Sequence, residues 1–296
     1  MNIARLKNFT EIVKNNFNIS ATAEKLYTSQ PTLSKQMKML EEELGLARGV
    51  VAQVEQIGQL SLGDQLATSG VLRIATTHTM TRYKLPAVIT EFSRRYPEVS
   101  IQLHQGAPAQ LAQMAQNGDV EMAIATESMH LFDELATVPC YRWGRSVVVP
   151  HGHPLLDCQP LAMADLARYP LITYVFGFTG RSKMDKAFGR HGLSPRIVLT
   201  ATDSDIIKHY VRLGMGVGVI ATSAFDEGDR ESLVCLNIDH LIASSVAHVC
   251  LRRHAHLRDY MYDFIHLYAP HVNREAVQLA LLNQGTPAPS ATLPWL

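Results

Sequence analysis

Residues 18–45 read NISATAEKLYTSQPTLSKQMKMLEEELG, and together with the glycine-free residues before them they predict three short helices. Ser29 ahead of Pro31 marks the start of the third helix, because proline is tolerated in a first turn. Only Tyr27 and Thr28 separate the second helix from the third, so we expect a tight turn there. The apolar stripes of the first and third helices are Leu6, Phe9, Ile12 and Val13, and Leu33, Met37, Leu40 and Leu44.

The third predicted helix has a polar face opposite its apolar stripe. Glutamine can pair with adenine in a DNA major groove, serine and threonine adapt to either base edge, and lysine meets phosphate or guanine. On spacing alone, a small helical bundle with a solvated polar face is an equally good interpretation. The polar residues expected on the outward face are Gln30, Thr32, Ser34, Lys35 and Lys38.

Beyond this segment, residues 46–62 carry an apolar face at helical spacing, which predicts a helix that packs on a partner, and residues 63–70 read as a linker. From Val71 the pattern alternates: strands at 71–76, 99–105 and 120–126 flank helices near 83–96 and 108–117. A second set follows, with strands at 146–150, 170–174, 196–201 and 217–221 and helices after Gly180 and near 204–213. Such alternation predicts βαβ units in mostly parallel sheets, here as two α/β lobes. The ending QGTPAPSATLPWL predicts a loose tail.

Threonines gather where predicted strands end and helices begin. Thr77, His78 and Thr79 follow the strand at 71–76, Thr126 closes the strand at 120–126, and Thr179 opens a helix. Free backbone N–H groups and the helix dipole at such points favour an anion, and ligands of doubly wound folds collect there. Each threonine alone is more commonly a helix cap. Together they predict recognition of a sulfate-like or carboxylate ligand by neutral donors.

Bulk properties exclude several classes of protein. Lys plus Arg (27) equals Asp plus Glu (27), so contact with DNA must come from a local patch. The four cysteines form no CxxC pair, which favours reduced thiols and no metal or other cofactor. No apolar run approaches the roughly 20 residues that span a bilayer, and no secretion signal is recognisable, so we expect a cytoplasmic protein without membrane contact.

No pattern of an enzyme stands out either. The chain has no GxSxG nucleophile elbow. The glycines of LGMGVGVI follow a predicted helix and precede a strand, the reverse of the order in a dinucleotide-binding loop. We therefore expect a protein that is not an enzyme.

The run at 18–45 resembles the helix-turn-helix of LysR-type transcriptional regulators, in the alanines of the scaffold helix, the SQPTLSKQ start of the recognition helix and the closing LEEELG. One departure concerns the next residues. The family continues with a Leu-Phe-x-Arg hairpin, the wing, and a Thr-Pro-Ala-Gly helix start, whereas here ELG runs directly into LARGVVAQVEQIGQL. The wing supplies contacts that fix register on the duplex, so its absence predicts weak or absent binding of operator DNA. The resemblance implies that the DNA-facing residues are Thr28, Ser29, Gln30, Pro31, Thr32, Ser34 and Lys35.

Residues 69–83 (SGVLRIATTHTMTRY), Thr126 with Glu127, and ITYVFGFTGRS resemble the effector domain of the CysB-like, sulfur-responsive branch of that family. Further similar segments are PHGHPL, TDSDIIKHYV and LGMGVGVIA. The family usually has glutamine after THT, and Met80 here removes that amide donor. The resemblance implies that the effector-binding residues are Thr77, Thr79, Thr126 and Thr179, with His78 and Met80 in the same loop.

The expected fold class is α/β, with an N-terminal helix-turn-helix module and linker helix followed by a two-lobed effector domain resembling type 2 periplasmic binding proteins. The expected divisions are a helix-turn-helix module at 1–45, a linker helix and hinge at 46–69, the effector-binding domain at 70–270 and a tail at 271–296. The expected partners are promoter DNA, a small anionic effector (sulfate, thiosulfate, O-acetylserine or N-acetylserine) and further copies of the chain in a homodimer or homotetramer. An effector-binding module with impaired DNA binding is the alternative.

Overall fold

The computed structural model describes residues 3–14, 22–23, 25–37, 39–40, 69–126, 134–158, 160–178, 180–253, 255–282 and 292–296. The chain divides into two compact units, Met1–Leu66 and Ala67–Leu296. The predicted linker helix at 46–62 and the missing wing lie outside the described residues. None of the helices among the described residues combines the length and apolarity that crossing a membrane requires.

The first unit begins with helix α1 (Ile3–Lys14), and residues 22–25 and 30–40 contain further helical residues. Its core consists of buried Ile12, Ala23 and Leu33, with Leu26 and Met37 packed against them. Phe9 is 45% exposed, so the predicted stripe of α1 was wrong at this position.

The expected turn and cap of the third helix are present. Tyr27 has a positive φ of 50°, which reverses the chain sharply between the helices. The Ser29 hydroxyl then accepts a hydrogen bond from the Thr32 amide (3.3 Å), the geometry of a helix cap. The third helix is therefore fixed at its amino end by its own sequence.

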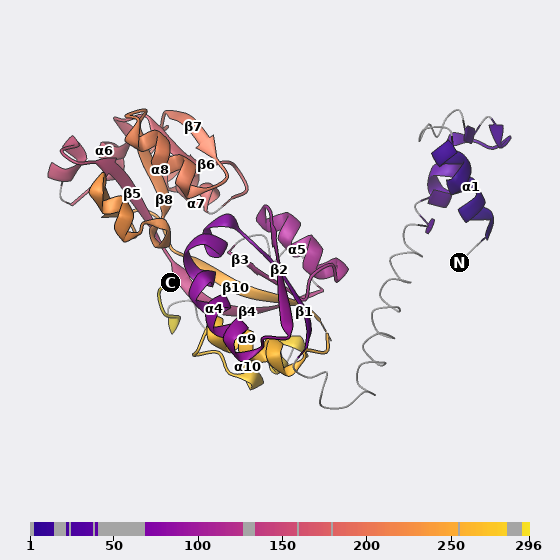
Figure 1. The fold of residues 1–296 in the computed structure, drawn as a ribbon. Helices are drawn as coiled ribbons and strands as arrows, with labels where there is room; N and C mark the ends of the chain where they lie inside the picture. The colour runs from indigo at the N-terminus through magenta and orange to yellow at the C-terminus, as the bar shows by residue number, and fades with distance from the viewer. Residues whose placement is uncertain are drawn as a thin grey trace. The chain divides into compact units, whose positions relative to one another are not determined.

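The second unit holds two five-stranded mixed sheets, one in each α/β lobe (Figure 1). In the first lobe the strand order is β2-β1-β3-β10-β4, and β10 runs antiparallel to both β3 and β4. The strands are β1 (Gly70–Thr76), β2 (Val99–Gln105), β3 (Met122–Ala125), β4 (Leu135–Trp143) and β10 (Ser245–Arg252). The helices are the π-helix η2 (Met80–Lys84), α4 (Leu85–Arg95), α5 (Pro108–Asn117), α9 (Asp259–Tyr268) and α10 (Arg274–Leu281).

The second lobe repeats this plan with the order β7-β6-β8-β5-β9. Its strands are β5 (Arg145–Pro150), β6 (Leu171–Tyr174), β7 (Ile197–Ala201), β8 (Val217–Ala221) and β9 (Leu233–Asn237). Its helices are α6 (Met163–Ala167), α7 (Arg181–Arg190), α8 (Ser204–Arg212) and the 3-10 turns η4 (Pro154–Asp157), η5 (Thr222–Ala224) and η6 (Glu227–Glu231). The chain enters this lobe at Gly144, between β4 and β5, and leaves it between β9 and β10.

Alternating side chains of β1 explain why the first sheet has helices on both faces. Leu72 and Ile74 pack in the core that contains Phe92 of α4 and Phe264 of α9, whereas Ala75 lies in the smaller cluster formed with α5. Successive residues of a strand point to opposite faces, so helices pack on both sides of the carboxyl half of β1, whereas Arg73 nearer its start is exposed.

Two expectations need correction. The sheets are mixed rather than mostly parallel, because β4, β5, β9 and β10, which the chain uses to pass between the lobes, add antiparallel pairs. Of the predicted loose tail at 284–296, residues 284–291 lie outside the described residues, whereas the described residues 292–296 contact the first lobe. Val277 and Leu281 of α10 are buried, since they lie four residues apart on one helix face, and Leu293 is buried as well. Backbone hydrogen bonds then join Arg142 to Pro294 and Leu296, both at 2.8 Å.

Candidate functional site

The loop after β1 carries the first two predicted threonines. Thr77 and Thr79 are 7% and 6% exposed. The Thr77 hydroxyl accepts from the Met80 amide at 3.4 Å and the Thr77 carbonyl from the Thr81 amide at 3.1 Å, so Thr77 acts as a helix cap. The helical turn starts at His78, earlier than the predicted start near Tyr83. This early start brings Thr79 and Met80 inside the protein.

Four of the predicted effector-binding residues line one small cavity. They are Thr77, Thr79 and Met80 from the first loop and Thr126 from the end of β3. The cavity volume is about 10 Å³, which is room for about one water molecule. Its remaining lining residues are Trp143, Ala221, Ser223 and Leu296. The cavity therefore joins the carboxyl ends of β1 and β3 in the first lobe to β8 and η5 in the second.

Of the other two predicted residues, only His78 can be compared with this lining. Thr179 lies outside the described residues. His78 lies next to the cavity rather than in it, and its Nδ1 atom is buried without a hydrogen-bond partner among the described residues. Among the lining residues of this cavity, the polar side chains are mostly hydroxyl groups.

A buried arginine that the sequence analysis did not single out lies close to the cavity. Arg145 is 2% exposed, and its guanidinium lies 4.5 Å from the ring centroid of Trp143. Its Nη1 donates to the Ala243 carbonyl (3.0 Å) and its Nη2 to the Ser245 hydroxyl (3.1 Å). An arginine among the apolar residues of RSVVVP is the signal that could have drawn attention to it. Its fixed positive charge favours an anion nearby.

Tyr174 of β6 approaches the same loop from the second lobe. It is 2% exposed, and its hydroxyl accepts a hydrogen bond from the Ala221 amide at 3.2 Å. Burial raises the pKa of Tyr174, and hydrogen bonds from Ala221 and Thr79 offset part of that rise. The phenol therefore stays protonated and neutral near pH 7, and it contacts a threonine of the opposite lobe.

The side chains of His78, Asp203 and Asp205 offer ligand atoms within 4.8 Å of one another. Both carboxylates already have partners, since Asp203 caps α8 by accepting from the Ile206 amide (2.9 Å) and Asp205 lies 3.4 Å from the ammonium of Lys208. A cation at this position would face a neighbouring positive charge. We therefore assign no metal to this cluster.

In the first unit, most of the described residues predicted to face DNA are exposed, whereas Leu33 and Leu40 of the same segment are buried. Thr28 is partly buried, whereas the exposed residues of this set are Ser29, Gln30, Pro31, Thr32, Ser34 and Lys35. Lys38 lies outside the described residues. A contiguous polar helix face is thus available for a partner.

Comparison with known proteins accounts for both units. Residues 3–47 match the family described as bacterial regulatory helix-turn-helix protein, lysR family, and residues 66–272 match the LysR substrate binding domain. The HTH-type transcriptional regulator CysB of Haemophilus influenzae is 42% identical, with 95% of this chain and 94% of that protein covered. The HTH-type transcriptional regulator SsuR of Burkholderia cenocepacia is 41% identical over 94% of this chain and 97% of that protein.

Solved structures agree with this assignment. The cofactor-binding domain of the Cbl transcriptional regulator is 42% identical and superimposes with a TM-score of 0.69, covering 72% of this chain and 94% of that chain. HinK, a LysR family regulator from Pseudomonas aeruginosa, shares the fold over 96% of this chain and 98% of that chain, with a TM-score of 0.60 and 21% identity. The predictions of a helix-turn-helix followed by two α/β lobes, and of a regulator rather than an enzyme, are confirmed. The chain belongs to the LysR family of bacterial transcription regulators.

Proposed function

We propose that this regulator controls genes of sulfur or cysteine metabolism in response to a small anion that binds between the lobes. The candidate effectors are sulfate, thiosulfate, O-acetylserine and N-acetylserine. One observation carries the proposal: Thr77, Thr79 and Thr126 line the same cavity although they come from two different strand ends. The similarity to regulators named CysB, SsuR and Cbl supports the assignment to sulfur metabolism.

The chemistry of the cavity suits an anion with a compact polar head. Three hydroxyl groups can each donate a hydrogen bond, and hydrogen bonds to a charged partner contribute about 1.5–3 kcal/mol each. Arg145 adds positive charge without lining the cavity. Thr179, next to the described Gly180, is a further proposed donor. Met80 and Trp143 supply apolar surface, which leaves room for an acetyl or similar group once the cavity opens.

We propose that the exposed face from Thr28 to Lys35, with Lys38, reads promoter DNA, and that the helix expected within 46–69 joins protomers into a homodimer or homotetramer in the cytoplasm. The alternative is an effector-binding module with impaired DNA binding. The sequence favours that alternative in one respect, because ELG at 43–45 runs directly into residues of the linker helix. A gel shift that compares this chain with a version carrying a restored wing separates the two functions, and equal affinities would refute impaired binding.

The sensing function is tested by thermal unfolding with each candidate anion. A ligand at about 100 times its Kd stabilises the folded state by about 2.7 kcal/mol. We expect one of the four anions to raise the midpoint temperature of unfolding, and we expect Thr77→Val or Thr126→Val to abolish that rise. Thr90→Val is the matched control, because Thr90 lies on the exposed face of α4 and bonds only to the Pro86 carbonyl, at 2.9 Å. Absence of stabilisation by every anion would remove the sensing proposal.

A further inference from the structure

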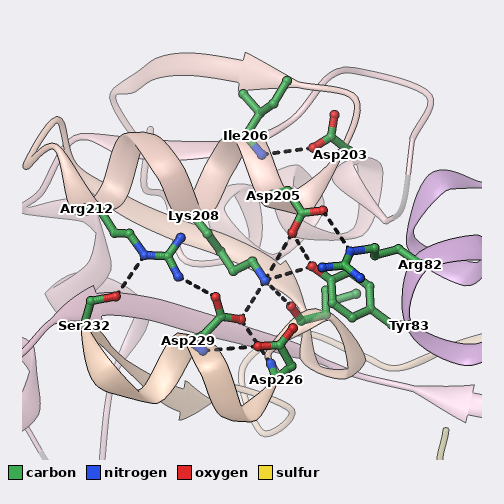
Figure 2. A network of polar contacts seen from close by, with 12 residues as sticks. Arg82, Tyr83, Asp203, Asp205, Ile206, Lys208, Arg212, Asp226, Asp229 and Ser232 are labelled. Atoms are coloured by element: carbon green, nitrogen blue, oxygen red, sulfur yellow. Dashed lines mark hydrogen bonds and ion pairs between the residues drawn. The ribbon is translucent and has the colours of Figure 1, made fainter.

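A polar network joins the two lobes beside the cavity, and a buried lysine is its centre (Figure 2). Lys208 of α8 has a side chain that is only 2% exposed. Its ammonium group donates hydrogen bonds to the Tyr83 hydroxyl at 2.8 Å, the Ala224 carbonyl at 2.9 Å and Asp229 at 2.6 Å. A buried charge is tolerated only when such partners surround it, so the position of Lys208 is closely fixed.

Tyr83 and Arg82 are the members of this network that come from the first lobe. Both lie on η2, whereas Asp205 and Lys208 lie on α8, and the Arg82 guanidinium lies 3.7 Å from the Asp205 carboxylate (Figure 2). The Tyr83 hydroxyl donates to the Asp205 carboxylate, and the Lys208 ammonium lies 4.9 Å from the centroid of the Tyr83 ring. Burial and the hydrogen bond to Asp205 raise the pKa of Tyr83 to about 12. The phenol therefore keeps its proton and can donate to Asp205 while it accepts from Lys208.

The segments that carry the network also form the wall of the cavity. Met80 lines the cavity and begins η2, the helix that carries Tyr83. On the opposite side, Ser223 lines the cavity and belongs to η5, whose Ala224 carbonyl accepts from Lys208. Short π-helices such as η2 often occur at functional sites, where they adjust the position of a side chain. The distance between η2 and η5 thus governs both the cavity and the network.

The observed arrangement leaves too little space for an effector. A cavity of about 10 Å³ holds about one water molecule, whereas sulfate has five heavy atoms. If the cavity widens by separation of η2 from η5, the hydrogen bonds that Tyr83 makes across the gap must lengthen or break. An effector and the Tyr83 contacts then stabilise different arrangements of the lobes.

We propose that Tyr83, held by Asp205 and Lys208, is a latch between the lobes that favours the effector-free arrangement and that effector binding releases. This inference rests on the proposed function, because it assigns regulation to the same cavity. The apparent affinity for a ligand falls in proportion to the fraction of molecules in the competent state. A weaker latch increases that fraction and so strengthens effector binding.

The variant Tyr83→Phe removes the hydroxyl and keeps the ring. It leaves Lys208 with Asp229 and the Ala224 carbonyl, and Asp205 has a side chain that is 41% exposed and so accessible to water. The fold should therefore persist. Tyr96→Phe is the matched control, because the Tyr96 hydroxyl donates to Asp263 at 2.6 Å but both residues belong to the first lobe. The net contribution of the two hydrogen bonds that the Tyr83 hydroxyl makes predicts that Tyr83→Phe binds the anion about five- to 100-fold more tightly.

The experiment titrates the full chain and both variants with N-acetylserine and with sulfate by calorimetry. It also follows amide hydrogen exchange without ligand. We expect Tyr83→Phe to bind the anion more tightly and to show faster amide exchange in residues 80–95 and 204–212. We expect Tyr96→Phe to keep the affinity of the unmodified chain and to show unchanged exchange in residues 204–212.

Several results would overturn the latch. Equal or weaker binding by Tyr83→Phe, or unchanged exchange in 204–212, contradicts it. The latch is also contradicted if Tyr83→Phe leaves the affinity unchanged while deletion of residues 292–296 raises it. In that case Leu296, which lines the cavity, would be the residue that closes it. If the unmodified chain binds neither of these anions, nor thiosulfate nor O-acetylserine, but Tyr83→Phe still accelerates exchange in both segments, the contact between the lobes stands and the proposed sensing function fails.

Discussion

Gly180 lies directly against the guanidinium of Arg145: a Cβ atom built on Gly180 would come 1.3 Å from Nη2 of that arginine. Gly180 also has a φ of +73°, in the left-handed region that favours glycine, and α7 begins at the next residue. The absence of a side chain thus lets a buried cation approach the loop that precedes α7. This contact packs the Arg145 side chain, at the start of β5, against that loop.

Gly180→Ala is predicted to lower the free energy of unfolding by about 2–4 kcal/mol, the sum of left-handed strain and overpacking. Gly177→Ala is the matched control, because its φ is +85° and no atom lies within 4 Å of the added Cβ. That variant should lose only about 1–2 kcal/mol from strain. Urea unfolding of both variants measures the difference, and equal losses would contradict close packing of Arg145 on Gly180.

Met80→Gln is predicted to bind the anionic effector more tightly and to be less stable without it. Met80 is 4% exposed, and its sulfur lies 3.9 Å from the Tyr268 hydroxyl. A glutamine there would bury an amide that has no ligand to bond in the empty cavity, at a cost of about 1–3 kcal/mol. The bound anion would then accept from that amide. Thermal unfolding with and without sulfate measures both the loss of stability in the absence of the anion and the gain in its presence. A variant that is destabilised equally in the two conditions would contradict the prediction.

Asp229→Asn is predicted to destabilise the protein at pH 7 by about 3 kcal/mol, because it removes the nearer and more buried of the two carboxylates that pair with the Lys208 ammonium and leaves only Asp205, at 3.4 Å. Burial acts to raise the pKa of Asp229, but hydrogen bonds from Lys208, the Asp226 amide and Arg212 outweigh burial and hold the pKa below 3.8. A carboxyl with a lowered folded pKa adds stability above its unfolded pKa and loses it as the pH falls through the folded value. The difference between the two proteins should therefore shrink below about pH 4.

Urea unfolding across pH 2–7 measures that difference. Asp259→Asn is the control, since Asp259 pairs with Arg274 at 2.7 Å but has a side chain that is 66% exposed. An exposed pair contributes about 0–1 kcal/mol, so this variant should follow the unchanged chain at every pH. A constant gap between Asp229→Asn and the unchanged chain down to pH 2 would contradict an ionised, paired Asp229.

Local signals predicted the parallel half of each sheet and much of the cavity. The strand at 99–105 and the helix at 108–117 coincide with β2 and α5, because alternation and a proline in the first turn depend on neighbouring residues alone. The threonines were predicted together for the same reason: each follows the end of a strand, and parallel strands end at one edge of a sheet.

Contacts between distant segments account for what the sequence did not predict. β10 completes the first sheet only after the chain returns from the second lobe, so no local pattern indicates its partners β3 and β4. Tyr83 and Lys208 are 125 residues apart, and nothing in either segment indicates the other. Proline and small residues predicted a loose tail at 284–296; within it only residues 292–296 are described, and there the buried Leu293 and the backbone bonds to Arg142 determine the position of the chain.

Gln30→Ala is predicted to weaken binding to specific DNA by about 1–3 kcal/mol without changing stability, because Gln30 is exposed and a bidentate contact to one base pair contributes this much. Ser29→Ala is the companion variant. The Ser29 hydroxyl caps the third helix, so its loss should lower the stability of the first unit by about 1 kcal/mol. Anisotropy titrations with DNA selected by the full chain, beside a scrambled duplex, separate the two effects. If Gln30→Ala weakened binding to both duplexes equally, Gln30 would contact the backbone rather than a base, and the reading face would have to be sought at Thr32 and Ser34.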